Sequence, residues 1–192
     1  MSDAPAHLVL PGYQNSGPEH WQSRWEAADP GFVRVQQADW DKPQLADWVA
    51  ELDRAVVAAG RPVVLVAHSL GCITVAHWAA GRTDTAGVLG ALLVAPADVD
   101  TAEVPELYGF RPVPLQPLPF ASTVVASSDD PWCTIERAAA FAAAWGSQFV
   151  GAGALGHINS DSGLGDWPEG RTLLTDLVGR AGPGGRAQRG RA

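Results

Sequence analysis

Short apolar runs alternate with segments of helical periodicity along most of the chain. Continuous or alternating apolar positions predict strands at 7–12, 32–37, 62–69, 87–97, 122–130 and 147–153. Apolar side chains at helical spacing predict helices at 44–59, 72–81, 136–145 and 172–180. Strands that alternate with helices are typical of βαβ units. The pattern therefore predicts an α/β fold, a three-layer α/β/α sandwich with a mostly parallel sheet.

Two segments depart from this pattern. Residues 98–120 contain five prolines and little periodicity, which indicates either a substrate-facing loop or a small excursion. Residues 181–192 are rich in Gly and Arg and poor in apolar side chains, so we expect a disordered basic tail. Residues 1–180 show neither a repeat nor a linker, and we expect them to form one domain.

Composition narrows the classes of function. With 192 residues and 46% hydrophobic content, the chain buries enough surface to fold without disulfides or metals. The net charge of -8 disfavours binding to nucleic acid or to an anionic membrane. No run is long enough for a membrane span, and the N-terminus has no secretory pattern. Cys72 and Cys133 form no CxxC pair, so we expect a reducing, cytoplasmic location.

A sharp turn between a buried strand and a helix carries the first candidate chemistry. The run from Val63 to Gly71 ends in Ala67-His68-Ser69-Leu70-Gly71. Small residues two positions before and after a serine allow strand and helix to approach closely, as a nucleophile elbow requires. Of the ten serines, Ser69 alone has Ala or Gly two residues before it and Gly two residues after it. Ser69 is therefore the candidate nucleophile.

A serine hydroxyl needs a base, and the base needs an acid that orients it. The order Ser, acid, His leaves His77 and His157, and His77 lies about two helical turns past the elbow, so His157 is the candidate base. The acid is Asp129 or Asp130, directly after a predicted strand. Asp130 is favoured because Pro131 holds its backbone extended, and Asp129 would then brace the turn. Asp98 is a remoter alternative.

Stabilising a tetrahedral oxyanion requires two backbone N–H donors. Leu70 follows the nucleophile and supplies one, and the loop after the first strand supplies the other through Tyr13, with Gln14 as the fallback. Further side chains near these loops are candidates for lining a substrate pocket, although capping or core packing would also explain them: Gln14, His20, Trp132 and Trp167. His68 is expected to pack or hydrogen-bond near the elbow. No metal-ligand spacing and no phosphate-binding Gly-rich loop occurs, so no cofactor is expected.

The sequence resembles the small α/β-hydrolase family of retinoblastoma-binding protein 9 and bacterial YdeN-like proteins. The resemblance covers most of the chain up to residue 180 and is carried by LVLPGYQNSGPEHWQSRWE (8–26), VLVAHSLGCITVAHW (64–78), VVASSDDPWC (124–133) and GHINSDSGLGDWPEG (156–170). It implies a Rossmann-like sandwich without a large lid, with Ser69, Asp130 and His157 as nucleophile, acid and base. Ala67 stands where Gly is more usual. The LxCxE type of motif is absent, so a retinoblastoma-type partner is not carried over.

Together these features predict a serine hydrolase that cleaves a small acyl ester or amide through an acyl-enzyme. The small-molecule substrate is the one partner expected. Two alternatives stay open at this point. An acyltransferase would use the same residues with another acceptor in place of water. A catalytically silent interaction module would keep the fold without an activated serine.

Overall fold

The computed structural model describes residues 4–82 and 84–181. Within them the strands are β1 (Ala6–Leu10), β2 (Phe32–Arg34), β3 (Val63–His68), β4 (Val88–Val94), β5 (Ala121–Ala126) and β6 (Gln148–Gly151). The α-helices are α1 (Trp21–Ala28), α2 (Leu45–Ala58), α3 (Leu70–Ala80), α4 (Ile135–Trp145) and α5 (Pro168–Ala181). Two short 3-10 helices, η1 (Pro105–Phe110) and η2 (Ser160–Ser162), lie in connecting loops.

The strands form one sheet in the order β2-β1-β3-β4-β5-β6, and every neighbouring pair is parallel. From β1 the chain passes outward to β2 and then returns to the other side of β1 as β3. The connections that follow β1 and β3 therefore leave in opposite directions. Ligands of open α/β sheets bind at such a switch point, at the carboxyl ends of the strands.

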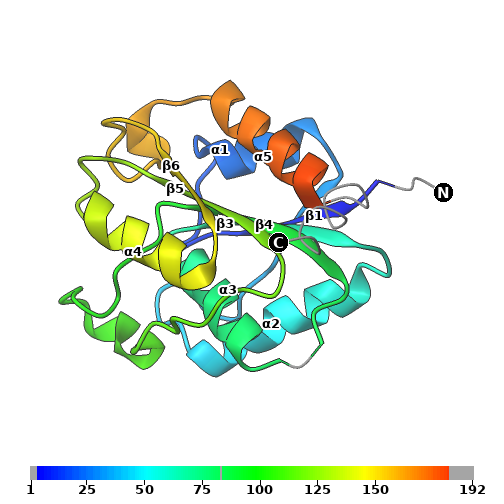
Figure 1. The fold of residues 1–192 in the computed structure, drawn as a ribbon, viewed down its shortest axis with the longest axis horizontal. Helices are drawn as coiled ribbons and strands as arrows, with labels where there is room; N and C mark the ends of the chain where they lie inside the picture. The colour runs from blue at the N-terminus through cyan, green and yellow to red at the C-terminus, as the bar shows by residue number, and fades with distance from the viewer. Residues whose placement is uncertain (1–3, 83, 182–192) are drawn as a thin grey trace, which may run out of the picture.

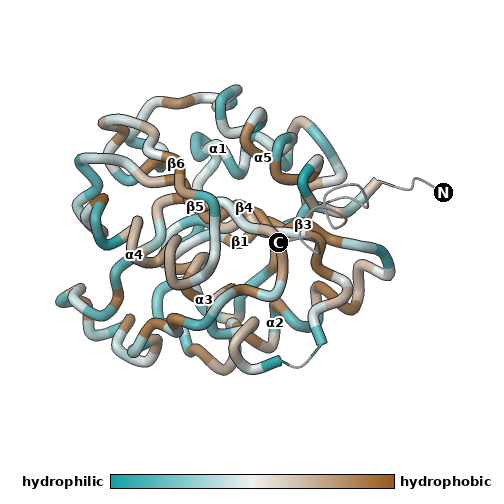
Figure 2. The backbone as a smooth tube through the Cα atoms, in the orientation of Figure 1, coloured by the Kyte–Doolittle hydropathy of each residue, from teal (hydrophilic) through white to brown (hydrophobic). Residues whose placement is uncertain are grey.

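Helices cover both faces of the sheet, as predicted (Figure 1). Helices α1 and α5 lie over one face, and α2, α3 and α4 lie over the other. Every residue of β3 is buried, which agrees with its continuous apolar sequence. In Figure 2 the most hydrophobic backbone runs through the middle of the molecule, and hydrophilic segments lie mainly at its periphery. The three-layer α/β/α sandwich is therefore confirmed.

All six predicted strands are present, each shorter than its apolar run. Helix α5 starts at Pro168 rather than 172, because proline is well accommodated in the first turn of a helix. It continues to Ala181, which is 5% exposed and packs as part of the domain rather than beginning the tail. Residues 182–192 lie outside the described residues, so the division of the chain into one domain and a disordered tail stays a prediction, and α5 ends one residue past the boundary expected at 180.

The proline-rich segment 98–120 packs onto the domain. Leu107 and Phe110 of η1, together with Val113, are buried in the core between the sheet and helices α2, α3 and α4. The ring of Phe110 packs edge-on against the ring of Trp48, with the ring centres 5.8 Å apart. Arg111 donates hydrogen bonds to the carbonyls of Val99 and Ala102. These contacts favour the small excursion over the substrate-facing loop.

Candidate active site

The turn between β3 and α3 holds Ser69 in an unusual backbone conformation. Its φ is 54° and its ψ is -121°, a region that non-glycine residues rarely adopt. Helix α3 begins at the next residue, Leu70. Strand, strained serine and helix in succession form the nucleophile elbow that the sequence predicts. The Ser69 residue is 9% exposed, so its hydroxyl lies in a mostly enclosed position.

The close approach of strand and helix explains the glycine after the elbow. A Cβ atom on Gly71 would lie 2.3 Å from the carbonyl oxygen of Leu10 and 2.8 Å from that of Pro11. Both distances are shorter than any real Cβ contact, so the backbone of β1 would have to move. Gly71 therefore sets the spacing between α3 and the loop after β1.

Three side chains from three different loops form one line of hydrogen bonds. Ser69 Oγ lies 2.9 Å from His157 Nε2. On the other side of the imidazole, His157 Nδ1 lies 2.9 Å from each carboxylate oxygen of Asp130. The Asp130 side chain is 2% exposed, so little water competes for its carboxylate. Ser69, His157 and Asp130 thus stand in the geometry that a serine triad requires.

The neighbouring carboxylates have other partners. Asp129 Oδ1 accepts hydrogen bonds from Ser127 Oγ at 2.7 Å and from the Gly156 N–H at 2.8 Å. These two bonds lower the pKa of Asp129. The bond to Ser127 braces the turn, as the sequence suggested for this residue, and the bond to Gly156 also ties the acid loop to the histidine loop. Asp98 lies 3.2 Å from Arg137 in an ion pair and accepts a hydrogen bond from Thr101. The structure does not bring Asp98 to His157.

Two backbone N–H groups beside the serine are free to donate. In the described part of the chain, neither the N–H of Tyr13 nor that of Leu70 has a hydrogen-bond acceptor. The N–H of Gln14 instead donates to the carbonyl of Trp40 at 2.9 Å. This bond argues against Gln14 as the fallback donor. Tyr13 belongs to the loop after β1 and Leu70 to the elbow, so both lie at the switch point of the sheet.

The candidate pocket residues divide into two groups. Trp132 is 39% exposed, and its ring centre lies 6.1 Å from that of His157. With His157 and Asn159 it lines a cavity of about 450 Å³ beside the triad. Gln14 is exposed on the loop after β1, with a φ of 64°. Trp132 therefore faces the cavity beside the triad, whereas a pocket role for Gln14 stays a prediction.

His20 and Trp167 are structural. His20 caps α1, because its Nδ1 accepts a hydrogen bond from the Gln22 N–H. Trp167 is 2% exposed and packs against the rings of Trp21 and Trp25, with centres 4.9 and 6.1 Å away. This packing agrees with the core role that was the alternative for Trp167. Its ring does not line the cavity beside His157, although Trp167 does line another cavity, of about 600 Å³, with Leu155 and Leu173.

Sequence reasoning placed His68 near the elbow, in packing or in a hydrogen bond, but missed the roles of Trp21 and Gln22, which also hold the loops of the site together. His68 Nε2 lies 2.8 Å from the carbonyl oxygen of His157, and Trp21 Nε1 donates to the carbonyl of Ile158 at 2.9 Å. Gln22, fully buried in α1, donates to the carbonyls of Leu10 and Val66. A polar residue between Trp21 and Trp25 could have indicated that Gln22 is buried and forms hydrogen bonds that link β1 and β3.

Burial holds two histidines and a thiol near the site in their neutral forms. Burial lowers the pKa of His20 to about 3, with further lowering by Arg34 and His157. Burial also places the pKa of His68 well below its ordinary value. The thiols of Cys72 and Cys133 are both buried, and burial raises the pKa of Cys133 to about 12. A thiol of that pKa is a poor nucleophile, which agrees with the expectation that neither cysteine acts chemically.

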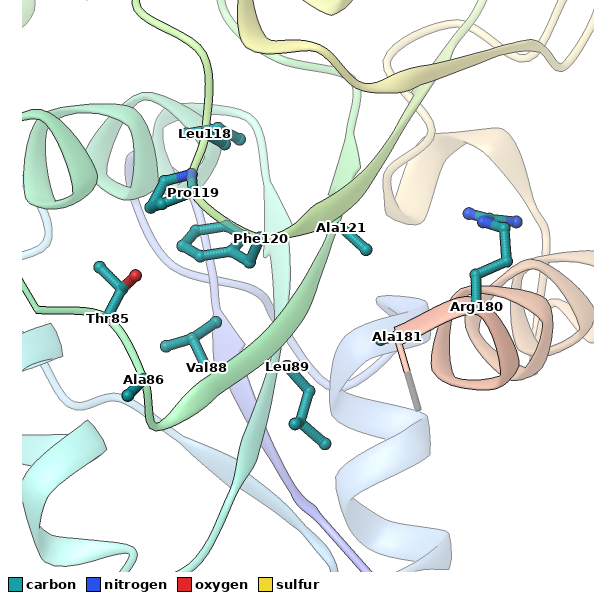
Figure 3. Close-up of a pocket in the computed structure, with 10 residues that line it drawn as sticks. All are labelled: Thr85, Ala86, Val88, Leu89, Leu118, Pro119, Phe120, Ala121, Arg180 and Ala181. Atoms are coloured by element: carbon teal, nitrogen blue, oxygen red, sulfur yellow. The ribbon is translucent and has the colours of Figure 1, made fainter. Parts of the chain in front are cut away.

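A second cavity, of about 430 Å³, lies at the amino ends of β4 and β5 (Figure 3). Phe120 and Arg180 are among its lining residues, and none of the triad residues reaches it.

Among residues 4–82 and 84–181, no helix is long and apolar enough to cross a bilayer. The same residues hold no cluster of three or more His, Cys, Asp or Glu that could bind a metal. The absence of a cofactor and the cytoplasmic location stay predictions.

Comparison with known proteins agrees with this geometry. A family model described as serine hydrolase matches residues 7–176. A solved structure described as a YdeN-like hydrolase, from Pectobacterium atrosepticum, is 32% identical and superposes with a TM-score of 0.82. That match covers 93% of this chain and 92% of the other. No curated protein matches the sequence.

More distant structures share the fold. The ydeN gene product of B. subtilis is 19% identical, with a TM-score of 0.73 over 92% of this chain and all of that chain (100%). Mouse alpha/beta hydrolase domain-containing protein 10 is 14% identical, with a TM-score of 0.72 over 93% of this chain and 91% of that one. These likenesses place the sandwich among α/β-hydrolase folds.

Proposed function

Because the chain belongs to the serine hydrolase family, we propose that this enzyme cleaves a small acyl ester or amide with Ser69, His157 and Asp130 as its triad. The observation that supports the assignment is the unbroken line of hydrogen bonds from Ser69 Oγ through His157 to Asp130. Each residue follows the carboxyl end of a different strand, at the edge of the sheet where ligands bind in open α/β folds.

In the acylation step, His157 Nε2 takes the proton of the Ser69 hydroxyl as the oxygen attacks the substrate carbonyl. Asp130 keeps the His157 proton on Nδ1 and stabilises the imidazolium that forms. The N–H groups of Leu70 and Tyr13 donate to the developing oxyanion. When the tetrahedral intermediate collapses, the bond to the leaving group breaks, and the imidazolium gives its Nε2 proton to that group.

In the second step a water molecule replaces the leaving group. His157 takes one proton from the water as its oxygen attacks the acyl carbon, and the same two N–H groups stabilise the second oxyanion. The bond to Ser69 Oγ breaks, and the proton held by His157 returns to that oxygen. The free acid leaves, and the enzyme regains its starting protonation state.

The size of the substrate is proposed from the surroundings of the triad. The segment between β4 and β5 contains one short 3-10 helix and packs against the core, where a lid domain would need many more residues. The cavity beside His157 holds about 450 Å³, at the low end of the range for small-molecule sites. An acyl group of a few carbons fits this space better than a long lipid chain.

Hydrolysis of a p-nitrophenyl ester series, from acetate to palmitate, tests this function. We expect kcat/KM to be highest for short acyl chains and activity to be lost in Ser69→Ala. Turnover by Ser69→Ala equal to that of the wild type would overturn the triad. A preference for palmitate over acetate would overturn the small-acyl assignment and leave the triad standing. Adding an alcohol to the same assay separates hydrolysis from acyl transfer, because a transferase would yield the new ester.

A further inference from the structure

We propose that His68, assisted by Trp21, is a positioning residue that fixes the backbone of His157 relative to Ser69; the inference rests on His157 being the base of the proposed reaction. His68 is the last residue of β3 and directly precedes the serine. Its side chain points away from solvent and is almost fully buried.

Two donors hold two successive carbonyls of that loop. His68 Nε2 lies 2.8 Å from the carbonyl oxygen of His157. Trp21 Nε1 donates to the carbonyl oxygen of Ile158, the next residue, at 2.9 Å. A carbonyl oxygen only accepts hydrogen bonds, so His68 must carry its proton on Nε2. Both donors are buried, and an unpaired buried carbonyl is costly, so each bond strongly favours one arrangement of the loop.

The loop needs such support because its backbone is strained. Ile158 has a φ of 47°, in the left-handed region that β-branched residues rarely adopt. Its side chain is fully buried in the core under α1 and α5. Strain of this kind persists only where the surroundings determine the conformation. The His68 bond holds the peptide group before Ile158, and the Trp21 bond holds the peptide group after it, so the two bonds flank the strained residue.

Two adjacent residues of the elbow both contact His157: Ser69, the proposed nucleophile, and His68. Ser69 Oγ contacts His157 at its imidazole Nε2, and His68, one residue earlier, contacts His157 at its backbone carbonyl. The distance between nucleophile and base therefore depends on two adjacent residues of one turn. His68 packs between the rings of His20 and His157, with centres 4.7 and 4.8 Å away, which limits its rotation.

Histidine variants with a matched control test the role. His68→Leu removes the donor, and His68→Gln restores an N–H at a similar distance from the backbone. His77→Leu is the control, because His77 Nε2 bonds the carbonyl of Phe110 at 2.9 Å, remote from the triad. We expect His68→Leu to lower kcat about 100-fold with KM within about twofold, since a small misplacement of a catalytic group has that effect. His68→Gln should recover most of kcat, and His77→Leu should keep wild-type values.

A tryptophan pair tests the second donor and covers the case in which His68→Leu does not fold. Trp21→Phe keeps an aromatic ring and loses the N–H to Ile158. Trp25→Phe is its control, because Trp25 Nε1 bonds the carbonyl of Asp166, and both residues lie in the same helix. Trp21→Phe should lower kcat more than Trp25→Phe at equal loss of thermal stability.

Several results would overturn the inference. One is a folded His68→Leu with kcat within about threefold of wild type. Another is a His77→Leu that loses as much kcat as His68→Leu. A third is equal kcat for Trp21→Phe and Trp25→Phe. Nitrogen NMR of the imidazoles adds a readout independent of activity: a wild-type His68 protonated on Nδ1 alone would also refute it. If the wild type itself has no esterase activity, the proposed function fails, whereas active wild type with active His68→Leu refutes the positioning role alone.

Discussion

A Cβ atom added to Gly12 would lie 2.7 Å from the Cβ atom of Ser69 and 3.2 Å from its hydroxyl oxygen. The loop after β1 therefore runs against the nucleophile with no room for a side chain. Tyr13, the proposed oxyanion donor, is the next residue, so this contact also sets where its N–H lies relative to the serine.

Gly12→Ala should lose most of its esterase activity while the fold survives. The added methyl group must displace either the serine side chain or the oxyanion loop, and loss of one oxyanion donor alone costs about 10²–10³ in kcat. Gly17→Ala in the same loop is the control, because a Cβ there meets nothing within 4 Å. Comparison of kcat and circular dichroism for the two variants checks the prediction. Equal activity would contradict the close contact.

Gly71→Ala should reduce stability rather than activity alone. Its methyl group would meet the backbone of Leu10 and Pro11, which cannot move aside like a side chain. Overpacking usually costs about 1–3 kcal/mol, and a clash with backbone belongs at the upper end or above it. Gly179→Ala, on an open face of α5, should be neutral or stabilising. Thermal unfolding of both variants gives the comparison, and an unchanged midpoint for Gly71→Ala would refute the expected clash.

Substitutions of the two adjacent aspartates should have very different effects on kcat. Asp130→Asn leaves His157 Nδ1 without its carboxylate and permits the wrong tautomer, so kcat should fall by about 10⁴. Asp129→Asn keeps an acceptor oxygen for Ser127 and Gly156 and should keep activity within about tenfold. Steady-state kinetics on one short ester measures both. The reverse order of effects would assign the acid to Asp129.

The buried His20 should make the fold sensitive to acid. Its pKa is lowered from 6.5 to about 3 by burial, Arg34 and His157, so the unfolded chain takes up the proton first as the pH falls. The stability that neutral His20 contributes is therefore full above about pH 6.5 and is lost as the pH falls toward its folded pKa. Burial also lowers the pKa of the neighbouring His68, so His68 likewise makes the folded protein less stable as the pH falls. Wild type and a His20 variant share this contribution.

His20→Asn isolates this contribution, because Asn is also a good helix N-cap. Between about pH 6 and 4 the wild type should lose stability more steeply than His20→Asn, by up to about 1.4 kcal/mol per pH unit. Urea unfolding at several pH values measures the two slopes. Parallel curves over this range would mean that His20 titrates normally in the folded protein.

Much of the fold and of the proposed triad was predictable because the relevant signals are local. Each strand is a short apolar run, and Ser69, Asp130 and His157 each follow one closely. The parallel arrangement then requires the three loops to meet at one edge of the sheet. Asp129 and Asp130 could be distinguished only by their position relative to Pro131, and the structure shows which carboxylate reaches the imidazole.

What could not be predicted depends on contacts between distant segments. The sequence does not indicate that Trp21 reaches the carbonyl of Ile158 or that Trp167 fills the space between α1 and α5. The sequence indicates helix α1 only weakly, because its two tryptophans lie four residues apart among polar and small residues. The start of α5 was hidden by the Gly- and Pro-containing stretch before residue 172.

The measurement that tests the central claim most directly is labelling with a fluorophosphonate probe, followed by mass spectrometry of the labelled peptide. Wild type, Ser69→Ala, His157→Ala and the control His77→Leu would be compared after circular dichroism has shown that each is folded. The triad predicts one adduct on Ser69 in the wild type and in His77→Leu, and none in Ser69→Ala or His157→Ala. Label on another residue, or labelling of His157→Ala at the wild-type rate, would contradict the account.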